Sequence, residues 1–122
     1  MKLLDDFYDI INSESIDNEY RYKVRFNPSH YIYQAHFPGN PITPGVCLVQ
    51  IVTEILQSTQ KKKIQLSSLN NIKFKKIVRP DNILLFVFTN IQYENSVLMA
   101  RVSIEDEQNQ FVKMSLVYNV ID

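Results

Sequence analysis

The segment from residue 45 to residue 60, GVCLVQIVTEILQSTQ, restricts the possible folds more than any other part of the sequence. At helical spacing its apolar side chains cover most of the circumference. The polar positions form one narrow stripe, which consists of Gln50, Thr53, Glu54 and Gln57. We expect Thr43 to cap this helix and Pro44 to lie in its first turn. A helix this apolar has to be buried, so the rest of the chain must surround it.

Alternating side chains predict that strands surround this helix. Residues 20–26 alternate aromatic or aliphatic with basic side chains, the pattern of a strand with one face in water. Further strands are predicted at residues 72–78, 83–93, 97–104 and 110–120. The adjacent Lys75 and Lys76 interrupt the alternation, which predicts a β-bulge.

The N-terminal apolar residues are spaced three and four apart and predict a short amphipathic helix, followed by a polar turn at residues 12–18. These apolar residues are Leu3, Leu4, Phe7, Ile10 and Ile11. The 122 residues suit one domain with its own core. We therefore expect a single α+β domain over residues 1–122, with one long buried helix, a short N-terminal helix and about five mostly antiparallel strands.

Composition excludes several functional classes. The 13 basic and 13 acidic residues cancel, so the chain lacks the overall positive field of nucleic-acid-binding proteins. A single cysteine, Cys47, cannot form an internal disulfide, and two separated histidines do not make a zinc pattern. No segment has the roughly 18 apolar residues of a membrane span, and the N-terminus is unlike a signal peptide. We expect a cytoplasmic protein without a metal; Cys47 and His30 are interpreted as structural.

The charges are unevenly distributed along the chain. Between residues 60 and 80 the sequence has seven basic residues and no acidic one. They are Lys61, Lys62, Lys63, Lys73, Lys75, Lys76 and Arg79. Such a segment is either a solvated face or a docking surface for an acidic partner.

Both glycines of the chain, Gly39 and Gly45, lie in one short segment together with three of the five prolines. That segment, residues 36–46, reads HFPGNPITPGV and resembles the signature HFPGxPxxPGV of the 3-hydroxyacyl-acyl-carrier-protein dehydratases. Residues 72–84, IKFKKIVRPDNIL, are similar to that family's KFxxxVxPGDxL segment, with Asp81-Asn82 in place of Gly-Asp.

The resemblance implies a hot-dog fold, in which a curled antiparallel sheet wraps around the long helix. It also implies a homodimer joined edge to edge, either alone or in a trimer of dimers, that converts 3-hydroxyacyl thioesters to trans-2-enoyl thioesters. The substrate would be carried on the phosphopantetheine arm of acyl carrier protein, and no other cofactor is implied. Lys73, Lys75, Lys76 and Arg79 would then form a docking surface for that acidic carrier.

The resemblance assigns roles to residues of the first motif. His36 removes the proton next to the thioester carbonyl, and the N–H of Gly45 binds the thioester oxygen. Phe37, Pro44 and Val46 adjoin these two residues and are expected to bind substrate. The physical chemistry of the segment agrees, because a helix N-terminus stabilises developing negative charge and glycine leaves the N–H accessible.

One position departs from the family pattern. The family has an acid 14 residues after the histidine, contributed by the other subunit, whereas this chain has Gln50, which cannot supply a proton as a carboxylic acid does. Glu54 could replace the acid directly or through a water molecule, or His36 could make both proton transfers while Gln50 orients the hydroxyl. Alternatively the chain is a non-catalytic acyl-thioester-binding partner of an active dehydratase, or an acyl-thioesterase in which Glu54 activates water.

Overall fold

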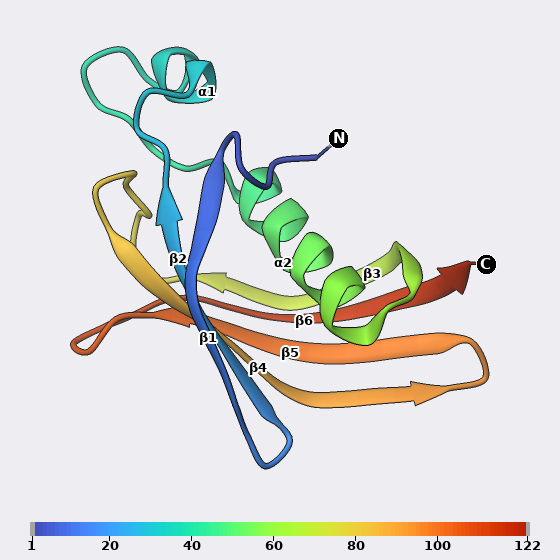
Figure 1. Ribbon diagram of the computed structural model, residues 1–122. Helices are drawn as coiled ribbons and strands as arrows, with labels where there is room; N and C mark the ends of the chain where they lie inside the picture. The colour runs from blue at the N-terminus through green and yellow to red at the C-terminus, as the bar shows by residue number, and fades with distance from the viewer. Residues whose placement is uncertain (1, 122) are drawn as a thin grey trace.

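The computed structural model describes residues 2–121 and contains a sheet of six antiparallel strands that curls around one long helix (Figure 1). The elements in chain order are β1 (Tyr8–Ile16), β2 (Glu19–Phe26), α1 (Tyr31–Ala35), α2 (Gly45–Gln60), β3 (Lys63–Phe74), β4 (Ile83–Glu94), β5 (Val97–Glu105) and β6 (Gln110–Ile121). The strand order is β1-β2-β4-β5-β6-β3, so β1 and β3 are the two edges. This is the hot-dog architecture that the sequence predicts.

Helix α2 forms the centre of the core, as its apolar circumference predicts. Ile51, Val52 and Leu56 are fully buried, and the inward-facing residues of β4, β5 and β6 surround them. The buried positions alternate along β5, at Leu98, Ala100, Val102 and Ile104. The helix ends at Lys61, which takes the left-handed conformation (φ 53°) that glycine usually supplies at this position.

The predicted N-terminal helix is wrong. Residues 8–16 form strand β1, which pairs with β2, and the polar turn shrinks to Asp17 and Asn18. A bulge between Ile10 and Asn12 shifts the pairing by one residue. Because the bulge places two apolar residues next to each other, it breaks the alternation and imitates helical spacing.

Strand β3 begins nine residues before the predicted position and ends at Phe74, before the predicted end at residue 78. Most side chains of this edge strand are exposed, so it lacks the alternation of a half-buried strand. The bulge expected at Lys75 and Lys76 is seen in the hydrogen bonds: both amides donate to the carbonyl of Phe111, at 2.8 and 3.2 Å.

Two smaller expectations also need correction. Pro44, not Thr43, is the N-cap of α2, and it makes no side-chain capping bond. The hydroxyl of Thr43 is instead buried 2.8 Å from that of Tyr33. The short helix α1 has no counterpart in the sequence analysis; its N-cap is His30, whose Nδ1 accepts from the amide of Ile32.

Candidate functional site

The segment after α1 folds into a tight loop that presents His36 to solvent. The amide of Ile42 donates to the carbonyl of His36 at 2.7 Å, and Phe37 and Asn40 exchange two backbone hydrogen bonds of 3.2 and 2.9 Å. Gly39 has φ 74°, a conformation that glycine adopts without strain, so its predicted role in the turn is confirmed. The exposed imidazole of His36 lies edge-on to the ring of Phe37, with the centroids 5.3 Å apart.

The loop is attached to the second motif of the sequence. The guanidinium of Arg79 donates to the side-chain oxygen of Asn40 at 2.6 Å, and the amide of Thr43 donates to the carbonyl of Val78 at 2.8 Å. Arg79 therefore braces the His36 loop in addition to any role in docking. Sequence analysis missed the contact between Arg79 and Asn40, because neither residue is a fixed position of the motif in which it lies.

The N-terminus of α2 borders a cavity of about 380 Å³. It is lined by Ile42, Thr43, Pro44, Gly45, Leu48, Phe74, Lys75, Lys76, Ile77 and Val78. A β-carbon on Gly45 would lie 2.8 Å from Cζ of Phe74, so the ring occupies the space that a side chain would need. The lack of a side chain at Gly45 therefore allows the close approach of the Phe74 ring, a feature that the sequence did not reveal.

The predicted substrate-binding residues separate into two groups. Pro44 and Gly45 line this cavity, whereas Phe37 lines a different one of about 330 Å³ beside Tyr33 and Pro41. Val46 is 69% exposed, which leaves a large aliphatic side chain in solvent at the start of α2.

The N-terminal segment runs close to α2 (Figure 1), and the side chain of Glu54 attaches it to that helix. Its carboxylate accepts from the amides of Leu3 and Leu4 at 2.7 and 2.9 Å and from the hydroxyl of Tyr8 at 3.1 Å. Gln50 donates to the same carboxylate at 2.8 Å. Burial and the nearby carboxylate raise the pKa of Tyr8, which keeps the phenol protonated as a donor.

Gln50 and Glu54 lie away from the cavity at Gly45 within one chain. They line a separate cavity of about 600 Å³, which we call the lysine cavity. Its lining residues are Lys2, Leu4, Gln50, Glu54, Gln57, Ser58, Lys61, Lys62 and Lys63.

The basic segment of residues 60–80 divides into two groups at opposite ends of β3. Residues 61–63 precede or begin the strand, and Lys73, Lys75 and Lys76 lie at its other end. The ten residue steps from Lys63 to Lys73 correspond to roughly 33 Å of extended strand. One chain therefore cannot present all seven charges as a single patch.

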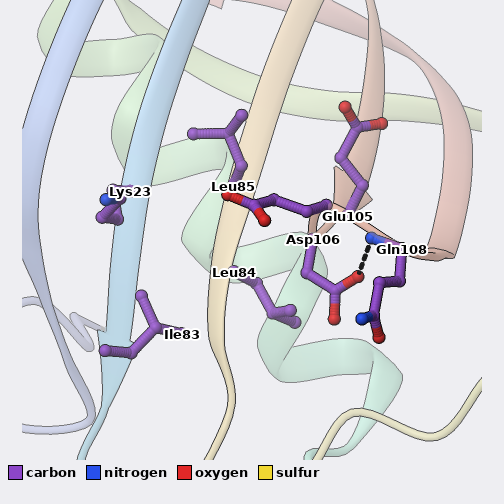
Figure 2. A pocket seen from close by; sticks show the side chains of 8 residues that line it. Lys23, Ile83, Leu84, Leu85, Glu105, Asp106 and Gln108 are labelled. Atoms are coloured by element: carbon purple, nitrogen blue, oxygen red, sulfur yellow. Dashed lines mark hydrogen bonds between the residues drawn. The ribbon is translucent and has the colours of Figure 1, made fainter.

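A further cavity, of about 650 Å³, contains none of the predicted site residues (Figure 2). It lies between Lys23 on β2, residues 83–85 on β4 and the turn after β5. The carboxylate of Asp106 in this turn accepts from the amides of Gln108 and Asn109 at 2.9 and 2.7 Å. Asp106 therefore helps to close the turn.

The remaining titratable candidates are structural. Burial raises the pKa of the Cys47 thiol, so it behaves as a small apolar residue. His30 is buried beside Phe7, and its Nε2 lies 3.2 Å from a carboxylate oxygen of Asp6. Among the described residues no group of three or more potential metal ligands occurs, and no helix there has the length and apolarity needed to cross a membrane.

Comparison with known proteins finds dehydratases by sequence. Residues 12–115 match the ApeI-like family, described as ApeI dehydratase. A 3-hydroxyacyl-[acyl-carrier-protein] dehydratase FabZ of Lactobacillus helveticus is 36% identical over 59 residues, covering 43% of this chain and 40% of that protein. FabZ of Caulobacter vibrioides is 36% identical over 81 residues, covering 59% of this chain and 46% of that protein. The matches span less than half the length of these relatives.

Comparison with solved structures finds the same fold. A chain of the dehydratase heterocomplex ApeI:P from Xenorhabdus doucetiae superposes with a TM-score of 0.74 at 21% identity, over 90% of this chain and 96% of that chain. A hypothetical thioesterase from Streptococcus pneumoniae with coenzyme A has a TM-score of 0.65 at 12% identity, over 93% and 85% of the two chains. Because the family match extends over most of the sequence, this hot-dog protein belongs to the ApeI-like dehydratase family.

Proposed function

We propose that this protein dehydrates 3-hydroxyacyl thioesters, carried by acyl carrier protein in the cytoplasm, to trans-2-enoyl thioesters. One observation carries the proposal: the His36 loop holds an exposed imidazole on the backbone segment that leads directly into the N-terminus of α2. A base and a set of helix N–H groups on one braced segment are the parts that proton abstraction next to a thioester requires.

In the proposed reaction His36 takes the proton from C2 of the substrate. The N–H of Gly45 and the positive end of α2 stabilise the negative charge that develops on the thioester oxygen. The electron pair then forms the C2–C3 double bond, while the C3–O bond breaks and the hydroxyl leaves with a proton as water. No net proton is gained or lost by the protein.

We assign both proton transfers to His36. The carboxylate of Glu54 already accepts from four donors, and the amide of Gln50 cannot supply a proton as an acid. Gln50 of a second subunit would orient the leaving hydroxyl, and Phe37, Pro44 and Val46 would contact the acyl chain.

The proposed active form is a homodimer joined through β3, which could assemble further into a trimer of dimers. β3 is one edge of the sheet and exposes Leu66, Leu69 and Phe74. Lys73, Lys75 and Lys76 beside the Gly45 cavity, with Arg79 next to them, would receive the acidic carrier.

The test is to incubate the protein with 3-hydroxyacyl carrier protein and to detect loss of water by mass spectrometry. The native chain should form the enoyl product, and His36→Ala should reduce the rate at least 100-fold, because general-base catalysis contributes about that factor or more. Equal product formation by His36→Ala would contradict the mechanism. Release of free acid would instead indicate a thioesterase. In that reaction Glu54 is the candidate base that activates water.

A second candidate is a non-catalytic partner of an active dehydratase. The missing acid at Gln50 favours it, and the related ApeI:P structure is described as a heterocomplex. This candidate predicts that the protein binds acyl carrier protein and neither dehydrates nor hydrolyses the attached thioester.

A further inference from the structure

The lysine cavity extends along the polar stripe of α2 from Gln50 to the end of the helix. Eleven residues separate Gln50 from Lys61, which corresponds to about 16 Å of helix. One end of the cavity is thus the position where the family has its catalytic acid, and the other end is a group of lysines.

The charge of the cavity is strongly positive at the lysine end. Lys61, Lys62 and Lys63 line it from the end of α2 and the start of β3, and Lys2 lines it from the N-terminal segment. Among the described lining residues Glu54 is the one acid, and its carboxylate is held by the four donors given above. Such a cluster is suited to bind a phosphate, which carries one negative charge as the diester that joins the arm to its carrier.

We propose that the lysine cavity binds the phosphopantetheine arm of the substrate, with Lys2, Lys61, Lys62 and Lys63 around the phosphate and the thioester end at Gln50. The proposal rests on the proposed function, because it uses Gln50 of one subunit to face His36 of the other. About 13 bonds join the phosphorus and sulfur atoms of the arm. An extended peptide has three backbone bonds per residue, so the arm is as long as slightly more than four extended residues, or about 15 Å. That length agrees with the distance along α2 from Gln50 to Lys61.

The experiment compares two ligands that differ by the phosphate, phosphopantetheine and pantetheine, in equilibrium binding by calorimetry. The native protein should bind phosphopantetheine at least tenfold more tightly, and Lys61→Gln with Lys63→Gln should remove this difference. Lys62 is kept, since its ammonium lies 4.3 Å from the centre of the Tyr93 ring. The matched control, Lys23→Gln with Arg101→Gln, removes two exposed charges on β2 and β5 and should leave the difference unchanged.

Kinetics with the 3-hydroxyacyl thioesters give a second readout. The K61Q/K63Q variant should raise KM about tenfold for the phosphopantetheine, coenzyme A and carrier-protein thioesters, with kcat and the pantetheine thioester unaffected. The ratio of kcat/KM for the carrier-protein and coenzyme A thioesters in the native protein identifies the natural source of the arm. An effect on the carrier-protein thioester alone would overturn the proposal, because the lysines would then contact the carrier surface.

The outcomes separate this proposal from the proposed function. Product formation without discrimination between phosphopantetheine and pantetheine overturns the phosphate site and leaves the dehydratase. Phosphate-dependent binding that is lost in K61Q/K63Q, with no enoyl product from any thioester, supports the site and contradicts the dehydratase. Thermal unfolding of K61Q/K63Q close to that of the control excludes misfolding as the cause.

Discussion

At the scale of single residues, Gly45 and Phe74 depend on each other. The ring of Phe74 is 57% exposed and can move, so a methyl group at residue 45 should displace it at modest cost. We expect Gly45→Ala to lower the free energy of unfolding by about 1 kcal/mol, the lower end of the range for overpacking. Chemical denaturation measures this change.

A double variant separates the packing effect from the effect on the reaction. Phe74→Ala combined with Gly45→Ala should restore the stability lost in the single glycine variant, because the methyl group then has space. Activity should stay low in the double variant, since the methyl group still crowds the N–H of residue 45. Recovery of full activity would show that only the displaced ring had impaired the enzyme.

The carboxylate of Glu54 should contribute more to folding stability than to the rate of the reaction. Glu54→Gln replaces an acceptor of four hydrogen bonds by an amide whose NH₂ group faces donors. We expect the free energy of unfolding to fall by about 2 kcal/mol, because several donors are left poorly satisfied. At a temperature where both proteins are folded, kcat should change less than threefold. A loss of kcat comparable to that of His36→Ala would instead identify Glu54 as the acid.

The first motif could be interpreted from the sequence because its glycines, prolines and histidine have strong local requirements. The Arg79–Asn40 hydrogen bond and the contact between Gly45 and Phe74 could not be predicted from the sequence. In both cases the two residues are far apart in the sequence, and nothing in either segment alone specifies the other.

At the scale of secondary structure elements, periodicity predicted well wherever one face is buried. Helix α2 has the predicted bounds, and β4, β5 and β6 agree within one residue at each end. The errors are at the two edges of the sheet, β1 and β3, where bulges and solvent on both faces weaken the alternation. Edge strands are shaped by their neighbours more than by their own pattern.

The β3 edge should carry the dimer contact, and β1 offers a matched control. Leu69 is 36% exposed on β3 and Ile11 is 43% exposed on β1. Leu69→Lys should shift the protein from dimer to monomer in sedimentation velocity, because lysine on an edge strand opposes pairing with another chain. Ile11→Lys should leave the dimer intact. A dimer that persists in Leu69→Lys and dissociates in Ile11→Lys would move the interface to the opposite edge.

At the scale of the whole molecule, a zero net charge conceals strong local fields. Basic residues gather at both ends of β3, while Glu105, Asp106 and Glu107 line the cavity of about 650 Å³. The order of charges along the sequence therefore predicted a basic segment but could not predict its division into two groups in space. That division follows from the twelve-residue length of β3, an element that the sequence only partly revealed.

Ionic strength should affect carrier-protein substrates more than small ones. Raising salt from about 0.01 to 0.15 M shortens the screening length from about 30 to 8 Å. We expect KM for the carrier-protein thioester to rise several-fold over this range and KM for the pantetheine thioester to stay constant. The same rise for both substrates would argue against electrostatic docking of the carrier.

The left-handed conformation of Lys61 suggests a compromise between thermal stability and ligand recognition. A non-glycine residue with φ 53° costs about 1 kcal/mol relative to glycine. Lys61→Gly should therefore raise the melting temperature by a few degrees and at the same time weaken phosphopantetheine binding, as calorimetry would measure. A protein engineer who replaced this lysine to obtain a more heat-resistant enzyme would remove the ammonium group that we propose binds the phosphate of the substrate arm.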